Sequence, residues 1–523
     1  PDRGYALAAL TGDLDIPGLK PAMLRTLVAD RVDPELFALS YDYVGDLAET
    51  IALIWPETDP TTPANPSIKT GIADRPATSR GIASALIVHP SLCEVIADLQ
   101  AAPRGKAPAL VALWLDRLPA TERFALLKLV TGGLRVGVSG RLARQALASL
   151  GAVEAAEIEE LWHGLAPPYA PLFDWLTGGA EKPVQAAACP FRPVMLAHPL
   201  DVETLPGLDP ADFIAEWKWD GIRVQASASN GVRRLYSRSG DDISKAFPDL
   251  LDALDFDGTL DGELLATRPG GIAEGIAPFA ALQKRLNRKT VSAKMIADAP
   301  AFLRAYDLLI DGGADLRETP FEARRARLGT LVAVLDPARA DVSESLAFDS
   351  FDTLARLREA PPDPVIEGLM LKRRDSPYRA GRIKGLWYKW KRDPHVIDAV
   401  LLYAQRGHGK RSGLYSDYTF GVWDGDALVP VGKAYFGFTD AELAKIDRFV
   451  RANTIERFGP VRSVRAEPQT GLVLEIAFEG LNRSTRHKSG GAMRFPRVAR
   501  LRWDKPPAEA DRLETLRKLL PRD

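Results

Sequence analysis

The spacing of apolar side chains predicts that the first third of the chain is almost wholly helical. Through residues 1–175 apolar positions recur every three or four residues, as on the buried face of a helix. In RLARQALASLGA we expect one such stripe to face a core, with Ser139, two residues ahead of Arg141, as the N-cap. The stripe consists of Leu142, Ala146 and Leu150. ATERFALLKLVTGG repeats the pattern and ends at a glycine pair, which is typical of a helix C-terminus.

Beyond the helical part the pattern changes twice. The irregular, proline-punctuated stretch GGAEKPVQAAACPFRPVMLAHPLD at 178–201 predicts a linker. From about residue 210 short strands alternate with turns and helices. After about residue 394, VIDAVLLYAQRG, YTFGVWDGDALVPVGKAYFG and TGLVLEIAFEG predict a small β-barrel. The chain is also too long for a single hydrophobic core. We therefore expect domains at 1–180, 192–393 and 394–523.

A hairpin can be predicted in detail within GIRVQASASNGVRRLYSRSG. The Asn-Gly pair at 230–231 is a strong signal for a two-residue turn, and apolar and polar positions alternate along 222–228. With that turn, paired residue numbers sum to 461 and Arg223 lies across from Arg238. Two arginines on one polar face repel each other unless an anion lies beside them. A register shift by a bulge, or side chains splayed into water, is the alternative.

Composition narrows the class of protein. The 523 residues are 46% hydrophobic and 26% charged, with a formal net charge of −1, as in an ordinary globular protein. No apolar run approaches the roughly 18 residues that span a bilayer, and no signal segment is visible. Cys93 and Cys189 alone cannot form a disulfide framework or a four-cysteine zinc site, which favours a reducing cytoplasm. Because the chain starts at Pro1, we expect natural residues to precede it.

The distribution of charge is more informative than the net charge. Residues 482–505, NRSTRHKSGGAMRFPRVARLRWDK, carry eight Lys/Arg and one acid. A tract of this density predicts a surface that faces a polyanion. The alternative, a solvated charged face, usually contains interspersed acids.

The stretch AEWKWDGIRVQ at 215–225 places Lys218 between two tryptophans. A lysine acts as a nucleophile only as the neutral amine, and a free lysine has a pKa of about 10.4. Burial between Trp217 and Trp219, together with neighbouring cations, would lower that pKa. An arginine could not take the same role, because it does not give up its proton.

Further polar residues lie in strand-like runs downstream. Taken singly, each is more often structural than functional. Together, a candidate nucleophile, carboxylates suited to Mg²⁺, opposed arginines and a lysine pair on one side of a strand indicate chemistry on a nucleotide phosphate. These residues are Asp261 and Glu263 in GTLDGELLA, Tyr306 and Asp307 in LRAYDLLI, Glu367 and Lys372 in VIEGLMLKRRD, and Lys389 and Lys391 in WYKWKRD.

The ordered series of motifs resembles the covalent nucleotidyltransferases, and most closely the ATP-dependent DNA ligases of the bacterial multi-domain type. KWDGIR is similar to the nucleophile motif, and SRSG, LDGELL, AYDLL, EGLMLK, KWK and RFPRVARLRWDK follow in the family's order. LLKLVTGGLRVGVSGRLARQALA resembles the helical DNA-binding domain, and AQRGHGKRSGLYSDYTFGVWD resembles the start of the OB domain. The main departure is Tyr306, where members often carry phenylalanine; either ring can stack on adenine.

The resemblance implies a multi-domain α+β fold. Its parts would be an all-α DNA-binding domain at 1–180, an α+β nucleotidyltransferase (ATP-grasp-like) adenylation domain at 192–393 and an OB-fold β-barrel at 394–523. The implied activity is sealing of nicks in duplex DNA with ATP, through lysyl-AMP and adenylated DNA, in repair, replication or recombination. Mg²⁺ would be the metal, with Mn²⁺ as a substitute.

The resemblance also implies a setting for the enzyme. We expect a bacterial, cytoplasmic and nucleoid-associated monomer that encircles nicked DNA independently of sequence. A repair helicase or nuclease is a possible partner that delivers the nick.

Roles carry over by motif position. Lys218 would be the nucleophile, Glu216 would accept from the adenine amino group and Tyr306 would stack on the ring. Glu263 and Glu367 would serve the ribose and the metal. The residues expected to hold nucleotide phosphates are Arg223, Arg238, Lys389 and Lys391. Those expected to meet pyrophosphate when the OB domain swings over the site are Arg497, Arg502, Asp504 and Lys505. Those expected to contact DNA are Thr131, Gly132, Gly133, Arg135, Gly137, Ser139 and Arg141; a simple helix C-cap is the alternative for this loop.

Other functions remain as alternatives. RNA ligases usually lack the RFPR…DK ending and capping enzymes lack a helical front domain. NAD-dependent ligases carry a four-cysteine zinc finger, which the two cysteines of this chain cannot form. A catalytically idle nick-binding scaffold would not form lysine-linked AMP, which separates it from an enzyme.

Overall fold

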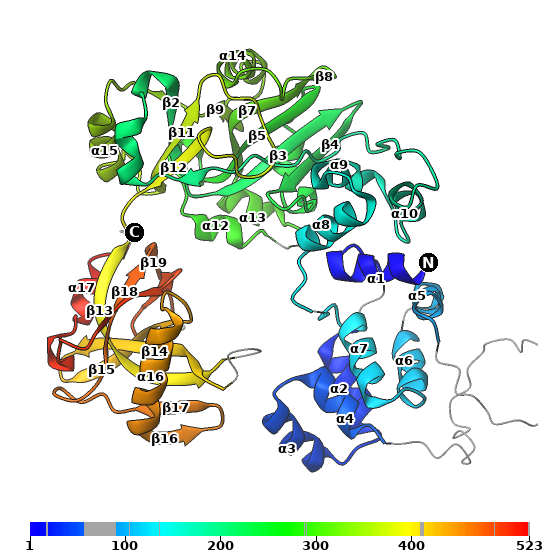
Figure 1. Cartoon of the computed structure of the whole chain (residues 1–523), viewed down its shortest axis with the longest axis vertical. Helices are drawn as coiled ribbons and strands as arrows, with labels where there is room; N and C mark the ends of the chain where they lie inside the picture. The colour runs from blue at the N-terminus through cyan, green and yellow to red at the C-terminus, as the bar shows by residue number, and fades with distance from the viewer. Residues whose placement is uncertain are drawn as a thin grey trace, which may run out of the picture.

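The computed structural model describes residues 1–16, 19–56, 90–103, 105–134, 136–286, 288, 290–407, 413–485 and 487–520. Figure 1 shows a helical part (residues 2–176), a middle part with two sheets (198–391) and a C-terminal part built on a curled sheet (395–517). Within the described residues no helix is both long and apolar enough to span a bilayer.

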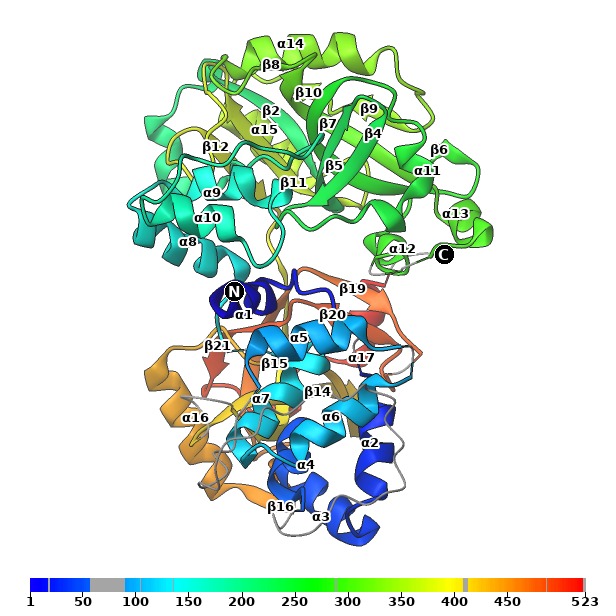
Figure 2. The ribbon, with the colours of Figure 1, turned by 90° about the vertical axis from the view of Figure 1, so that its right-hand side faces the viewer.

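The helical part has two separate hydrophobic clusters. The outer lobe packs around α2, α4, α6 and α7, and the inner lobe packs around α1, α8, α9 and α10. In Figures 1 and 2 the inner lobe lies against the middle part. The helices are α1 Asp2–Thr11, α2 Pro21–Ala29, α3 Pro34–Val44, α4 Leu47–Ile54, α5 Leu92–Ala101, α6 Ala107–Leu115, α7 Ala120–Val130, α8 Gly140–Gly151, α9 Ala155–Leu161, the 3₁₀ turn η1 Trp162–Gly164 and α10 Ala170–Leu176.

Helix α8 confirms the expected cap but not the expected buried face. The Ser139 hydroxyl accepts a hydrogen bond from the Leu142 amide at 3.2 Å. The stripe expected to be buried is exposed: Leu142, Ala146 and Leu150. The buried side chains are instead Ala143, Leu147 and Ala148. This helix carries two apolar stripes, and the neighbouring helices decide which one enters the core.

The segment at 178–201 contains little regular structure, as expected of a linker, but it is firmly packed. Cys189, Phe191 and Met195 are buried. The Cys189 thiol donates to the Val232 carbonyl at 3.2 Å, and the backbone of Arg192 exchanges two hydrogen bonds with the side chain of Gln225. The linker is therefore held against the hairpin of the middle part.

The middle part consists of two sheets that face each other around the candidate site. One has the order β1-β12-β11-β2-β10, and the other has the order β4-β3-β5-β7-β8, with β6 on β5 and β9 on β7. The strands are β1 His198–Pro199, β2 Phe213–Trp219, β3 Ile222–Ser229, β4 Val232–Ser237, β5 Gly258–Arg268, β6 Gly271–Ile276, β7 Ala301–Asp311, β8 Ala314–Asp315, β9 Ala340–Val342, β10 Ser345–Leu346, β11 Ile366–Arg373 and β12 Trp387–Lys391. The helices are α11 Pro248–Leu251, α12 Phe279–Gln283, α13 Ala293–Asp298, α14 Phe321–Val332 and α15 Phe351–Glu359.

The β3–β4 hairpin confirms the predicted register. Pairing runs from Val224 opposite Ser237 to Ser229 opposite Val232. The turn residues at 230–231 have φ of 50° and 76°. Positive φ at both turn positions is the mark of a type I′ turn, which matches the twist of the two strands.

The C-terminal part curls because the long strand β13 pairs with β14 and β17 and also with β18. This arrangement is consistent with an OB fold, as predicted. The elements are β13 His395–Arg406, β14 Tyr415–Asp424, β15 Ala427–Ala434, α16 Asp440–Ala452, β16 Thr454–Phe458, β17 Val461–Val464, β18 Val473–Phe478, β19 Gly480–Arg483, β20 Gly491–Arg494, β21 Arg497–Arg502 and α17 Leu513–Arg517.

Candidate active site

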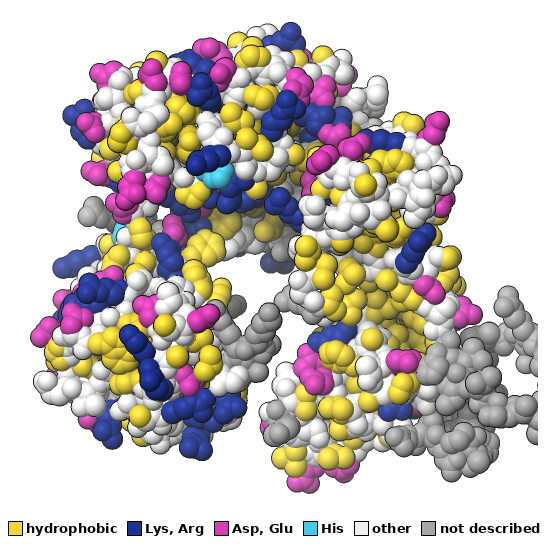
Figure 3. All heavy atoms as spheres, in the orientation of Figure 1, with side chains coloured by type: hydrophobic (Ala, Val, Ile, Leu, Met, Phe, Trp, Pro, Cys, Tyr) yellow, Lys and Arg dark blue, Asp and Glu magenta, His cyan; other side chains and the backbone are white. Residues whose placement is uncertain are grey.

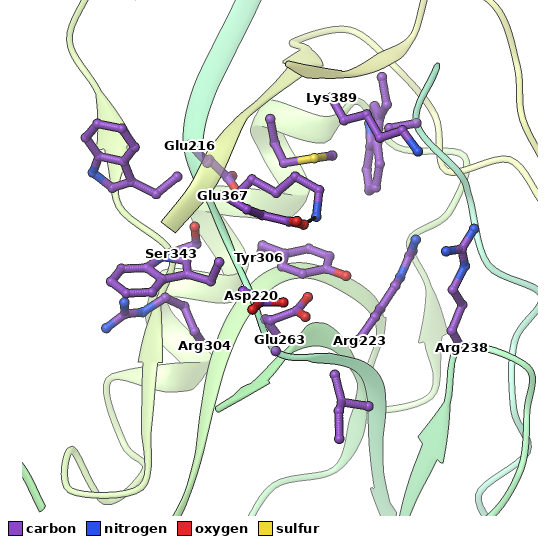
Figure 4. A pocket seen from close by; sticks show the side chains of 18 of the residues that line it. Glu216, Asp220, Arg223, Arg238, Glu263, Arg304, Tyr306, Ser343, Glu367 and Lys389 are labelled. Atoms are coloured by element: carbon purple, nitrogen blue, oxygen red, sulfur yellow. Dashed lines mark hydrogen bonds and ion pairs between the residues drawn. The ribbon is translucent and has the colours of Figure 1, made fainter. Parts of the chain in front are cut away.

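A cavity of about 450 Å³ lies between the two sheets of the middle part (Figure 4). Strands β2, β11 and β12 of one sheet and β3, β5 and β7 of the other supply its walls. Side chains two apart on a strand share a face, so alternate residues of these strands point into the cavity. Motifs that are far apart in the sequence therefore meet there.

Lys218, near the end of β2, projects into this cavity and donates a hydrogen bond to Glu367 on β11. The Lys218 side chain is partly buried, as expected, with 22% of its surface exposed, but it is not enclosed between the rings of Trp217 and Trp219. Side chains alternate along a strand, so the tryptophans project to the other face of β2, although both also reach the wall of the cavity. Trp217 belongs to a hydrophobic core, and Trp219 packs against that core and under the guanidinium of Arg304 at 4.3 Å. The tryptophans fix the strand, and the lysine faces charged groups.

Glu367 is held by two ammonium groups. Besides Lys218 it pairs with Lys391 at 3.1 Å. Burial works to raise the pKa of Glu367, but Lys218 and Lys391 outweigh burial and hold this pKa below its usual value. Lys391 also reaches Glu479 of the C-terminal part at 3.5 Å.

Glu263 on β5 has a very different environment. Burial raises its pKa to about 7, against an attraction to Lys218, and repulsion from Glu367 adds to the rise. Among the described residues no hydrogen bond or ion pair to its carboxylate is present. A carboxylate that is costly to ionise and lacks a partner suits a hard divalent cation, whose ligands are oxygen atoms.

The raised pKa of Glu263 makes the stability of the metal-free protein pH-dependent. Between its ordinary 4.5 and about 7, the folded chain binds more protons at this site than the unfolded chain, so stability falls as pH rises through that window. The loss is at most about 3 kcal/mol. Glu263→Gln should remove it, so that in EDTA the variant unfolds at higher urea than the wild type at pH 8 but not at pH 5. Parallel pH profiles for the two proteins would contradict this.

At the far end of the cavity a buried ion cluster surrounds Glu216. One of its oxygens accepts from Arg325 at 2.5 Å and the other from Lys372 at 3.1 Å. The ammonium of Lys372 lies 4.1 Å from the centroid of the Tyr306 ring, which also lines the cavity. The sequence predicted both Glu216 and Tyr306 here but gave no sign of Arg325.

An anion does lie beside one of the opposed arginines of the hairpin, and it is a carboxylate of the protein. Arg223 already has an internal counter-anion, since it pairs with Asp261 at 2.5 Å and also donates to the Met195 carbonyl at 2.6 Å. The hydroxyl of Tyr378 donates to the same Asp261 carboxylate at 2.6 Å. The anion that balances Arg223 is thus part of the protein, because β5 lies beside β3.

Arg238, by contrast, belongs to a set of cations without counter-ions, which we call the anion site: Arg238, Arg382 and Lys389. Burial lowers the pKa of Lys389, and repulsion from Arg382, Lys218, Lys391 and Arg238 lowers it further. Burial lowers the pKa of Arg238 as well, and repulsion from Arg223 and Arg382 lowers it further. No carboxylate within the described residues pairs with these three groups. Arg382 lies in a loop without a recognised motif, so no sequence pattern pointed to it.

The C-terminal residues expected at the site are elsewhere in this structure. Arg497 pairs with Glu479 at 3.0 Å and Lys505 with Asp398 at 2.7 Å. Arg502 and Asp504 pair with each other at 2.9 Å. A different arginine, Arg494, makes two hydrogen bonds to Asp220, two residues after the candidate nucleophile.

The loop expected to contact DNA has mixed features. Thr131 donates to the Leu127 carbonyl at 2.7 Å, as a residue does at a helix end, and Gly132 and Gly137 have φ of 67° and 78°. Ser139 caps α8 and Arg141 is exposed. Arg135 lies outside the described residues. Close backbone approach of a phosphate to this loop stays a prediction.

An α+β middle part with a cation-lined cavity, followed by an OB-like sheet, is the architecture expected of a nucleotidyltransferase. Residues 194–391 match the ATP dependent DNA ligase domain, and residues 411–505 match the ATP dependent DNA ligase C terminal region. The chain belongs to the ATP-dependent DNA ligase family. It is an ATP-dependent DNA ligase, with ATP and DNA as substrates, so the family expected from the motifs is confirmed.

Individual relatives agree with this assignment. A probable DNA ligase of Koribacter versatilis is 37% identical over 431 residues, which are 77% of this chain and 73% of that protein. A DNA ligase of Thermococcus onnurineus is 28% identical, over 78% of this chain and 73% of that protein. The solved chain Pmar-Lig_PreS3 has a TM-score of 0.52 at 17% identity and covers 92% of this chain and 99% of that chain, which is a likeness of fold.

Proposed function

We propose that the enzyme seals nicks with a 5′-phosphate and a 3′-hydroxyl through an adenylate on Lys218. The observation that carries this proposal is the position of that lysine: it projects from β2 into the cavity, beside Glu367 and near the cations of the anion site. In the first step its Nζ forms a bond to the α-phosphorus of ATP, and the bond to the bridging oxygen breaks as pyrophosphate leaves with the electron pair.

Glu367 orients the nucleophile before that step. The hydrogen bond from Lys218 fixes the Nζ atom beside the Glu367 carboxylate. Attack requires loss of a proton and release from the carboxylate, so the resting contact restrains the amine until a nucleotide arrives. Lys391, on the other oxygen of Glu367, keeps that carboxylate ionised.

The anion site suits the phosphates of the later steps. In the second step an oxygen of the DNA 5′-phosphate bonds to the AMP phosphorus and the bond to Lys218 breaks. In the third step the 3′-hydroxyl bonds to the 5′-phosphorus and AMP leaves. Arg238, Arg382 and Lys389 would bind these phosphates, since phosphate would replace the missing counter-ions. Glu216 and Tyr306 would hold adenine, and Arg223, held by Asp261, would help to shape the nucleotide pocket.

A divalent cation fits beside the nucleotide. Glu263 and Glu367 would hold it, because both carboxylates line the cavity and Glu263 has no partner among the described residues. When bound, Mg²⁺ or Mn²⁺ would offset the negative charge of the phosphates and of the leaving group.

Nicked DNA would lie in the space between the three parts. Figure 3 shows a central hollow there, with Lys and Arg side chains on the middle part along its upper edge. The Thr131–Gly137 loop and Arg141 of the helical part would add contacts to phosphates that are independent of sequence. A nicked duplex with a 5′-phosphate should be sealed, and one with a 5′-hydroxyl should not. Sealing of a nick in an all-RNA duplex but not in DNA would overturn the proposed substrate.

Four residues of the C-terminal part are expected to act in adenylation, after a rearrangement that breaks their present ion pairs: Arg497, Arg502, Asp504 and Lys505. Arg497→Ala and Lys505→Ala should therefore slow formation of the Lys218 adenylate by roughly tenfold or more. Sealing by enzyme that has been adenylated beforehand should change much less. The two rates can be measured separately with labelled ATP and with purified enzyme–adenylate. Equal losses in both assays would contradict a role for these residues in adenylation.

A further inference from the structure

The inner lobe touches the loop that carries Arg238. His163, in the turn η1, has its Nε2 atom 2.6 Å from the carbonyl oxygen of Gly240. Gly240 closes the tight loop that follows β4, and Ser237, Arg238 and Ser239 of this loop line the cavity. The helical part thus reaches to within two residues of a member of the anion site.

The contact is tightly packed on both sides. The ring of His163 stands edge-on to Tyr236 at 4.7 Å and tilts against Phe191 at 5.7 Å between centroids. Gly240 has a φ of 90°, and a Cβ at this position would lie 3.2 Å from Phe191 and 3.3 Å from His163. Only glycine combines this backbone conformation with so close an approach. The histidine is therefore fitted to this loop.

The hydrogen bond has one direction. A carbonyl oxygen only accepts, so Nε2 of His163 carries the hydrogen. Its Nδ1 atom is buried and has no hydrogen-bond partner among the described residues. Burial also lowers the pKa of His163. The ring is consequently a neutral donor with the hydrogen on Nε2.

The loop transmits the position of Gly240 to Arg238 because it is cross-linked internally. The Gly240 amide donates to the Ser237 carbonyl at 2.9 Å. The Ser237 hydroxyl accepts from the amides of Ser239 and Asp241 at 3.3 and 3.2 Å. A shift of Gly240 would therefore move the backbone of Arg238 with it.

We propose that His163 is a positioning residue for Arg238, so that the helical part completes the anion site as well as binding DNA. This inference rests on the proposed role of Arg238 in binding phosphate. The side chain of Arg238 has no counter-ion within the described residues, so the backbone of its loop must define where its charge lies. His163 fixes that backbone from outside the middle part.

The test is a double-mutant cycle on sealing by pre-adenylated enzyme at a saturating nick. His163→Phe keeps an aromatic ring but removes the donor, and should slow sealing roughly tenfold. Introduced into Arg238→Ala, the same change should cause no further loss, because coupled residues are not additive. His163→Gln, which can donate to the Gly240 carbonyl, should stay within about threefold of the wild type.

Glu160→Gln is the matched control at the same interface. It weakens the ion pair between the inner lobe and Arg317 without touching the Arg238 loop, and sealing should remain at the wild-type rate. If His163→Phe has no effect, or if its loss is the same in both backgrounds, the inference is overturned. If Arg238→Ala itself seals normally, the proposed anion site fails instead. The two failures are therefore distinguishable.

Discussion

Lys218→Ala is expected to abolish formation of the enzyme–adenylate, by a factor on the order of 10⁴ or more, while binding of nicked DNA remains largely intact. No neighbouring residue can replace the lost amine. Lys391 is held by Glu367 and Glu479, and Lys389 lies at the anion site. The measurement is transfer of label from α-labelled ATP to protein, with a parallel binding assay on a nicked duplex.

Lys218→Arg is the matched control for charge. It preserves a cation that can pair with Glu367, yet arginine does not lose its proton and cannot attack phosphorus. We expect this variant to be as inactive in adenylation as Lys218→Ala. Labelled protein from either variant would show that another residue is the nucleophile.

The second large effect is expected at Lys389. Lys389→Ala should reduce the overall sealing rate by roughly 10²- to 10³-fold, the usual cost of removing a fixed donor that faces developing charge. This lysine sits among like charges without a carboxylate partner in the described chain, an arrangement that a phosphate group would relieve. Single-turnover sealing from ATP and nicked DNA is the appropriate assay.

Lys384→Ala is the control, since Lys384 is an exposed residue of the preceding loop. Its rate should match the wild type. A Lys389→Ala enzyme whose sealing rate is within threefold of the control would contradict the anion site. If the three cations bind the reacting phosphates, removal of one of them must slow sealing.

The sequence predicted those features that depend on neighbouring residues. The Asn-Gly turn determines the hairpin register, because both turn residues must adopt positive φ. Alternation along β12 places Lys389 and Lys391 on one face, and both do line the cavity. The order of motifs led to the family for the same reason, since the motifs are short segments in strands or in the turns beside them, and each contains its own candidate residue.

Features that depend on tertiary packing were predicted wrongly or only in part. Helix α8 has two apolar stripes, and only its neighbours make Leu147 the buried one rather than Leu142. The tryptophans beside Lys218 point into the opposite side of the sheet. Arg223 finds its anion in Asp261, 38 residues away. Local spacing contains no information about such partners.

Residues outside any motif were missed altogether. Arg382 lies in a loop and His163 in the 3₁₀ turn η1, both outside the recognised motifs. Arg494 does belong to a motif, but its partner Asp220 lies 274 residues away, and local spacing does not predict that pair. The basic tract at 482–505 was expected to face a polyanion because acids are scarce within it. Several of its cations pair with carboxylates outside the tract: Arg494, Arg497, Arg502 and Lys505.

The most direct test of the account is intact-protein mass spectrometry after incubation with ATP and Mg²⁺, with peptide mapping, followed by addition of nicked duplex DNA. We predict one added AMP on Lys218, which disappears as the nick is sealed. An AMP on a different residue, or one on Lys218 that persists while the nick is sealed, would contradict the central role of Lys218.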